Sequence, residues 1–411
     1  MHYRQKPILS KDGSRAVPDP FAGPSNEELA KLPIPFFRPD GRIAVILNPW
    51  LPVIPTQKAK SSLWRRLIPV KANCVPPVSL NELLVAISKM DIVNNNMAFA
   101  PVRRYLLWMR YDGSRFPEMA KGGSKFGVMD LTDAALSTTF SEFNIGPSSR
   151  TDAGVHALRT AILLNVPQTS APKDELSCID GRKEHLNRWN AIIKEANDGL
   201  EFLDVHPVAR GFCARKSIAY RRYVYRLAVV RSMELWERLS EKPSPVCFSE
   251  RNYSWRLPPG FDYRKAQEAC NLFLGTHNMA SFFKHSNRER QRDIEIPTTM
   301  RTIFLVSVDQ GGPHSIENDI YDYYNITIVS PAYLREQIRR MMALIVGSGY
   351  GHVPSDLIPW LLNNPKPNNF FDRGLHIAPP QGLFLADVVY DRRMFKNPVP
   401  SYVQGWDLAS L

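Results

Sequence analysis

Downstream of about residue 103, apolar and polar side chains alternate in short runs, as they do along half-buried β-strands. In residues 321–329, Ile326 and Ile328 alternate with Asn325 and Thr327, which places the two sets on opposite faces of a sheet. The pattern predicts strands over residues 105–111, 161–166, 222–230, 321–329 and 383–390.

Between these runs, apolar side chains recur every three or four residues, which is the spacing of one helix face. The clearest case is residues 332–346, where Leu334, Ile338, Met341 and Ile345 form one stripe. The pattern predicts helices over residues 128–143, 184–197, 263–274 and 332–346. Helices interleaved with strands indicate an α+β fold with a mixed or antiparallel sheet flanked by helices.

Differences in composition along the chain divide it into four parts. Residues 1–100 carry so many prolines that long helices or central strands are excluded, so this extension is expected to be largely irregular, with a short helix near 79–90 and some order near 43–47. Two subdomains are predicted over residues 101–245 and 246–400, with a Pro- and Ser-rich break at 240–261 and a tail at 401–411.

Charge and cysteine usage narrow the class of protein. The formal net charge is +12, with a pI near 9.4, which favours a polyanionic partner such as nucleic acid; a basic surface with no such partner is the alternative. The five cysteines are widely spaced and form no C-x-x-C motif, which argues against disulfides and zinc and favours a reducing compartment. We expect an intracellular protein, either mitochondrial or cytoplasmic and nuclear.

Several motifs are missing from the sequence. It has no phosphate-binding loop, dinucleotide fingerprint, zinc-protease helix or serine-hydrolase elbow, so we expect no cofactor and no metal. No apolar run approaches the roughly 18–20 residues that a membrane span needs, so no membrane association is expected.

The stretch PSSRTDAGVHALRTAILLNV, residues 147–166, places charged residues directly before an apolar strand. This order is poorly suited to a core but can present a carboxylate at a strand edge. Asp152 therefore has two interpretations: it caps a turn through nearby amides, or it is a nucleophile or base kept ionised by an arginine. His156 is expected to be packed and hydrogen-bonded rather than catalytic.

Basic side chains alternate with aromatic ones in a later strand, where Arg221 and Arg222 precede Tyr223 and Tyr225. On a strand the two tyrosines share one face and Arg222 points to the other. Such a pattern can stack an unpaired base and hold its phosphate, although ordinary aromatic packing gives the same pattern.

Two further basic stretches have a functional and a plain interpretation. Arg335 and Arg339 lie four residues apart on the predicted helix 332–346, beside its apolar stripe. Arg339 is placed to reach inward to a carboxylate, whereas Arg340 fits a solvated face. The stretch 284–293 is expected to be a flexible basic loop, either solvated or in contact with a phosphate.

Taken in order, these segments resemble the TruA family of tRNA pseudouridine synthases. The octapeptide RTDAGVHA at 150–157 matches the family's catalytic-aspartate block almost completely. Collinear matches surround it, and Ser148-Ser149 is most like the pseudouridine synthase-like 1 subgroup. The other matching segments are YDGS at 111–114, F-x-AR at 212–215, RYVY at 222–225, GTHN at 275–278, SF at 281–282, RTI at 301–303, L-x-x-QIR at 334–339 and GLFL at 382–385.

The resemblance implies a pseudouridine synthase fold, in which the two predicted subdomains are catalytic and the active cleft lies between them. It also implies an isomerase that needs no cofactor and takes uridine out of its stack. It makes Asp152 the catalytic carboxylate, Arg339 its partner, and Tyr223 the ring that stacks on the flipped uracil. Arg150 would fill the vacated space, and Leu383 would pack beside the pocket. Basic side chains would bind the RNA or line its approach: Arg159, Arg215, Lys216, Lys284, with Arg210, Arg288, Arg292 and Arg335.

The implied partner is structured RNA, tRNA first and mRNA second, bound by a homodimer. The alternative from another class is a catalytically inactive RNA-binding or assembly protein on the same fold. Such a protein could lose Asp152, Tyr223 or Arg339, and all three are present, so the sequence favours the enzyme.

Overall fold

The computed structural model describes residues 102–396, apart from 122–125, 169, 171–175, 177, 210, 241–247, 285–297, 314–319 and 392. The expectations for the extension 1–100, including its short helix at 79–90 and the order near 43–47, lie outside the described residues. So do the tail 401–411, most of the basic stretch 284–293, and Arg210, Arg288 and Arg292.

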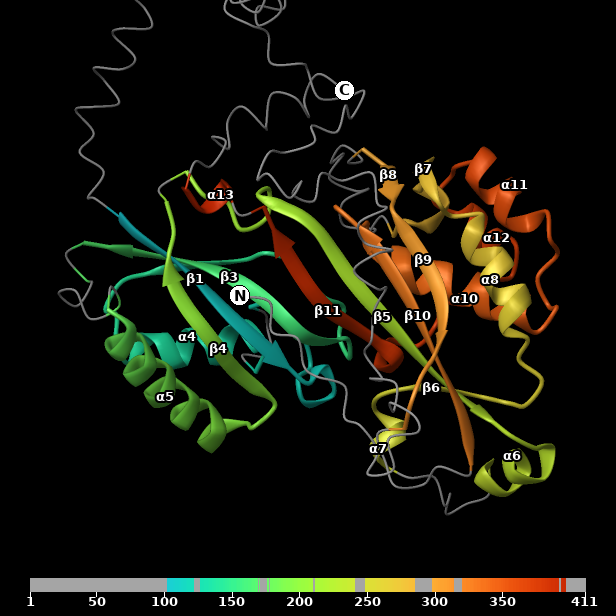
Figure 1. The fold of residues 1–411 in the computed structure, drawn as a ribbon, viewed down its shortest axis with the longest axis horizontal. Coiled ribbons are helices and arrows are strands. Elements are labelled where there is room, and N and C mark those ends of the chain that lie inside the picture. The colour runs from blue at the N-terminus through green and yellow to red at the C-terminus, as the bar shows by residue number, and fades with distance from the viewer. Residues whose placement is uncertain are drawn as a thin grey trace, which may run out of the picture.

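Nine strands of the described residues form one continuous sheet (Figure 1). Its main path runs β4-β1-β3-β11-β5-β10-β9; in addition, β2 pairs with β3 and β6 pairs with β5. Strands β7 and β8 form a separate two-stranded sheet. The strands are β1 Val102–Tyr111, β2 Asn144–Pro147, β3 His156–Pro167, β4 Leu200–Pro207, β5 Ile218–Val230, β6 Trp255–Leu257, β7 Gly275–Asn278, β8 Met300–Ile303, β9 Leu305–Gln310, β10 Tyr321–Ser330 and β11 Leu383–Tyr390.

The last strand, β11, joins the two halves of the sheet. It runs parallel to β3, with Phe384 opposite His156, and antiparallel to β5, with Leu385 opposite Tyr223. A strand near the C-terminal end of the described residues therefore lies at the centre of the sheet, directly beside the strand that follows Asp152. This arrangement brings the start of β3 close to the middle of β5.

Helices pack at both ends of this sheet (Figure 1). In the first half, α4 and α5 contact each other, and α5 lies on β4. In the second half, α8 packs on α10 and on β9. The helices are α4 Val128–Ser137, α5 Ile179–Ala196, α6 Met233–Ser240, α7 Phe248–Arg251, α8 Tyr263–Asn271, α10 Gln337–Gly349, α11 Leu357–Asn363, α12 Asn369–Asp372 and α13 Arg393–Lys396. The predicted α+β architecture with a mixed sheet is confirmed.

Strand β5 shows how the alternation in the sequence divides the core. Tyr223, Tyr225 and Leu227 belong to the main hydrophobic cluster. Ala228 and Val230 belong to a smaller cluster. Because successive side chains of a strand point to opposite faces, this central strand presents apolar side chains to both faces of the sheet.

Several predicted boundaries are wrong. The helix expected over 128–143 ends at Ser137, and the helix expected over 332–346 begins only at Gln337. Arg335 therefore precedes α10, and Glu336 adopts a left-handed backbone with φ of 64°. The break expected at 240–261 contains β6, which pairs with β5.

Arg340 is also placed differently from the expectation of a solvated face. Its side chain is buried and donates to the carbonyl oxygens of Ser281 and Pro367 and to the carboxylate of Glu336. Helical spacing could not reveal this, because the groups that bury Arg340 come from other segments.

Within the described ranges, no helix has the length and apolar character needed to cross a membrane.

Candidate active site

Asp152 lies on a loop, here called the aspartate loop (residues 148–155), that runs between β2 and β3. The loop is attached to the sheet at its start: the Ser148 N–H donates to Ala161 O at 2.9 Å, and the Ala161 N–H donates back to Ser148 Oγ at 3.3 Å. Further along, the hydroxyls of Thr151 and Tyr111 lie 2.7 Å apart. The loop is thus held along its length by hydrogen bonds.

Gly154 gives the aspartate loop its turn. Its φ of 77° lies in the left-handed region that side chains rarely adopt, and a Cβ at this position would approach Pro380 Cγ to 3.0 Å. The Val155 N–H closes the turn by donating to Asp152 O at 3.1 Å. The glycine in the motif therefore serves both backbone conformation and close packing against the segment before β11.

Asp152 forms an ion pair with Arg339 of α10: Arg339 Nη1 lies 3.3 Å from Asp152 Oδ2. The Nε–H of Arg339 donates to Ala378 O at 2.8 Å, and the Ala378 N–H donates back to Arg339 O at 3.2 Å. The guanidinium is thus aimed by its own helix and by the segment before β11. The Asp152 side chain keeps 31% of its surface exposed, so its carboxylate is both paired and accessible.

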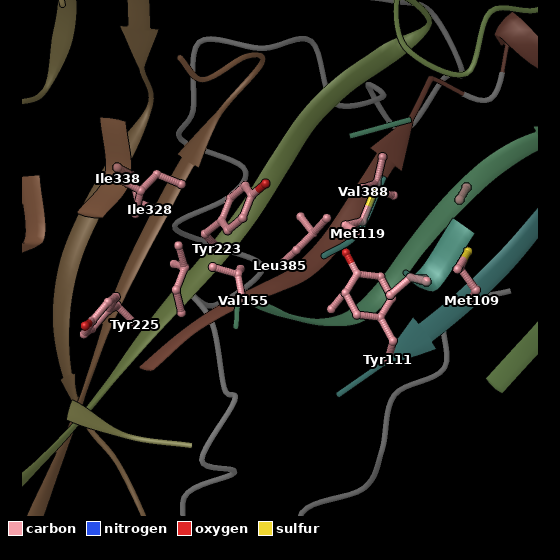
Figure 2. Close-up of a cluster of buried hydrophobic side chains, with 14 of the residues drawn as sticks. Met109, Tyr111, Met119, Val155, Tyr223, Tyr225, Ile328, Ile338, Leu385 and Val388 are labelled. Atoms are coloured by element: carbon pink, nitrogen blue, oxygen red, sulfur yellow. The ribbon is translucent and has the colours of Figure 1, made fainter. Parts of the chain in front are cut away.

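Tyr223 points from the centre of β5 toward the aspartate loop, and its hydroxyl lies 3.4 Å from Ser149 Oγ. Its ring makes an edge-on contact with Tyr333 at 5.1 Å between centroids. Figure 2 shows Val155 and Leu385 between Tyr223 and Tyr111 in the buried cluster. Burial raises the pKa of the Tyr223 hydroxyl, so the hydroxyl keeps its proton at neutral pH.

His156 is buried and serves packing, as expected. Its ring stacks on Phe384 at 4.6 Å, and Nε2 lies 3.0 Å from Asn252 O and 3.2 Å from Gln381 O. Nδ1 lies 3.1 Å from the backbone nitrogen of Gly113. The imidazole therefore joins several segments behind the aspartate loop.

Asp112 lies beside that histidine, with Oδ1 3.0 Å from His156 Nδ1. Burial alone would raise the pKa of this carboxyl, but contacts with His156, Ser114 and Tyr253 hold it well below its usual range. Asp112 is therefore ionised at neutral pH and is a fixed negative charge in the turn that supports Gly113.

The remaining predicted site residues lie at different distances from Asp152. Leu383, the first residue of β11, is buried opposite Tyr225. Arg150 is exposed on the aspartate loop itself. Arg215 and Lys216 are exposed in the turn before β5.

Arg159 and Lys284 are engaged with acids. Arg159 Nη1 lies 2.9 Å from Asp387 Oδ1, and Asp387 pairs in register with Arg222. Neighbours in register share a face, so this pair lies on the opposite face from Tyr223. Lys284 Nζ lies 2.7 Å from Glu336 Oε1. Neither cation is brought to Asp152.

Sequence reasoning missed four residues that shape the site: Tyr111, Arg221, Tyr333 and Glu336. Glu336 precedes α10 in its left-handed conformation; burial acts to raise its pKa, but hydrogen bonds from Lys284 and Arg340 hold that pKa below its usual value. Tyr111 ends the predicted strand 105–111 and Arg221 directly precedes the predicted strand 222–230. The sequence did not reveal that they contact Thr151 and Ser148 in the aspartate loop.

In the part of the chain that the structure describes, no three His, Cys, Asp or Glu side chains gather as a metal site would require.

Comparison of the sequence with known proteins identifies the family to which the chain belongs. A family model described as tRNA pseudouridine synthase matches residues 269–391. The human tRNA pseudouridine synthase-like 1 is 30% identical over 306 residues, covering 70% of this chain and 90% of its own. The Xenopus laevis protein of that name is 28% identical over 295 residues, covering 70% and 91%.

A bacterial relative, tRNA pseudouridine synthase A of Thermus thermophilus, is 26% identical over 292 residues and is matched over 97% of its length. The chain therefore belongs to the tRNA pseudouridine synthase family, the TruA type, as its motifs indicated. Members of this family are isomerases that convert uridine to pseudouridine.

Proposed function

We propose that this protein isomerises uridine to pseudouridine in tRNA, with Asp152 as its catalytic carboxylate. The observation that supports the proposal most directly is the Asp152–Arg339 pair: two residues 187 positions apart lie 3.3 Å from each other, and the carboxylate stays partly exposed.

The reaction needs a carboxylate and no redox partner. The C1′–N1 bond of uridine breaks, the uracil turns, and C1′ bonds to C5; the proton leaves C5 and N1 gains one, so the product is an isomer. Asp152 acts at the sugar, either as a nucleophile on C1′ or as a base. Both roles use the carboxylate form, and the Arg339 guanidinium lies 3.3 Å from that carboxylate.

The other side chains of the site supply binding and geometry. Tyr223 stacks on the uracil once it has left the RNA stack, and its protonated hydroxyl faces the aspartate loop. Arg150, exposed on the loop, enters the space that the uridine leaves. Leu383 closes the apolar side of the pocket.

Basic residues near the loop are proposed to hold the RNA backbone. Arg215 and Lys216 are exposed directly before β5 and are the first candidates. Arg159 and Lys284 are also exposed and would contact RNA further from Asp152, beside their acidic partners. We propose tRNA as the substrate, with mRNA as a second one, a homodimer as the active form, and action inside the cell.

The test is pseudouridine mapping in tRNA incubated with the purified protein and its variants. Asp152→Asn should abolish pseudouridine while leaving tRNA affinity within about threefold. Asp322→Asn is the matched control, because Asp322 is exposed on β10 and pairs only with Arg231 among the described ion pairs; it should remain active.

Two results would contradict the proposal. If wild-type protein binds tRNA but forms no pseudouridine in tRNA or mRNA, the inactive RNA-binding alternative is correct. If Asp152→Asn converts uridine at the wild-type rate, the assignment of Asp152 is wrong.

A further inference from the structure

Arg221 connects the two segments that carry the Asp152–Arg339 pair. Its Nη2 donates to Ser148 O at 2.8 Å, at the start of the aspartate loop, and its Nη1 donates to Pro331 O. Pro331 follows β10 and begins the segment that leads into α10. One guanidinium therefore joins the approach to Asp152 with the approach to Arg339.

The surroundings of Arg221 hold it in place. It lies on β5 opposite Ser330 and Val388, so strands on both sides fix its backbone. The Tyr333 hydroxyl donates to Arg221 O at 3.4 Å. Tyr223, two residues along on the same face, contacts Ser149 and Tyr333. The side chains of β5 thus contact both segments in succession.

Burial separates Arg221 from the exposed cations that bind RNA. Its side chain is 7% exposed, and two of its nitrogens already donate to backbone carbonyls. A planar guanidinium can bond two acceptors at a fixed spacing, whereas a lysine ammonium acts as a single point charge. The geometry suits a rigid connection between segments better than capture of a phosphate.

We infer that Arg221 is a positioning residue, which sets the geometry of Asp152 against Arg339 by joining residues 148 and 331. The inference rests on the proposed function for its effect on rate. Small displacements of a reacting group, of about 1 Å, can slow an enzyme by about a hundredfold. Arg221 acts through the aspartate loop and does not touch the reacting atoms.

The test compares Arg221→Met, which removes both hydrogen bonds, with Arg221→Lys, which keeps the charge but loses the fork. Arg231→Met is the charge-matched control, because Arg231 directly follows β5 and pairs with Asp322 at the surface. At a temperature well below every Tm, kcat should fall at least tenfold for Arg221→Met and by a smaller factor for Arg221→Lys. The tRNA Kd should stay within about threefold in all three variants.

A second measurement is independent of activity. Hydrogen exchange without RNA should be faster in residues 148–155 of Arg221→Met than in the wild type, and unchanged in the centre of β10. If the wild type forms no pseudouridine, the proposed function fails, and hydrogen exchange still decides whether Arg221 orders the loop.

Three results would overturn the inference. One is a kcat of Arg221→Met equal to that of the wild type, when the wild type is active. Another is weaker tRNA binding together with a slope of log Kd against log salt concentration that is reduced by about 0.7–0.9, which is the effect of losing one phosphate contact. The third is unchanged exchange in the aspartate loop of both Arg221 variants.

Discussion

Asp152 and Arg339 should stabilise each other by a measurable coupling energy. The perturbation is a double-mutant cycle with Asp152→Asn, Arg339→Met and the double variant. If the ion pair exists in solution, each single variant loses the same interaction, and the double variant loses it only once.

The size of this coupling follows from the geometry. Two unit charges 3.3 Å apart attract by about 5 kcal/mol at an effective dielectric of about 20, and by about 1.3 kcal/mol in bulk water. The side chains are 31% and 18% exposed, so the environment lies between these limits. Because desolvation cancels part of the attraction, we expect a net coupling of about 1–2 kcal/mol.

The assay is equilibrium urea unfolding of the four proteins, followed by tryptophan fluorescence. The exposed pair Arg231–Asp322, with side chains 44% and 54% exposed, is the control cycle and should show a coupling below about 0.5 kcal/mol. Arg339→Met should also lower the rate of pseudouridine formation at least tenfold. Additive single effects, within about 0.3 kcal/mol, would refute the pairing.

Two further predictions concern the support of the site. Gly154→Ala should lower the unfolding free energy by about 1–2 kcal/mol, because residue 154 has a left-handed backbone, and it should slow catalysis because the new Cβ contacts Pro380. The control is Gly260→Ala, where φ is 99° and the surroundings are open; it should lower stability but not activity. Equal activity of the two variants would contradict this prediction. The second prediction concerns Asp112, whose pKa in the folded protein lies below its ordinary value of 3.8. The ionised carboxylate therefore stabilises the folded state fully above pH 3.8, and this contribution is lost as the pH falls toward the folded pKa. Thermal unfolding between pH 5 and pH 3 should therefore show a shallower decline of Tm for Asp112→Asn than for the wild type, and identical slopes would exclude this role.

Local pattern was sufficient for the central strands. Residues 222–230 and 383–390 are mostly apolar because side chains on both faces of these strands are buried, and β5 and β11 lie there. Weaker signals were missed. Strand β4 is as long as β11, but acids interrupt its apolar residues and Leu200, Phe202 and Val205 do not keep a regular spacing of two. Strand β9 spans only Leu305–Gln310, which leaves few positions for periodicity to decide.

The first residue of α10 could not be predicted from the apolar periodicity, because it depends on contacts with residues outside the helix. The apolar stripe continued back to Leu334, but the chain before α10 turns at Glu336 and the Leu334 N–H donates to Gln337 Oε1. Arg339 and Arg340 are neighbours with similar sequence context. One faces Asp152 and the other is buried against Ser281 and Pro367.

The sequence by itself determined the chemistry available to this protein: an aspartate before a glycine turn, a tyrosine on an alternating strand and an arginine beside an apolar stripe. These are local facts, because covalent order and backbone preference fix them. The resemblance to the family also indicated Arg339 as the partner of Asp152. Only the tertiary structure decided how that guanidinium is held and that Arg221 joins the two approaches. Placing β11 between β3 and β5 brings together segments nearly two hundred residues apart, and that choice depends on packing and strand register across the whole sheet.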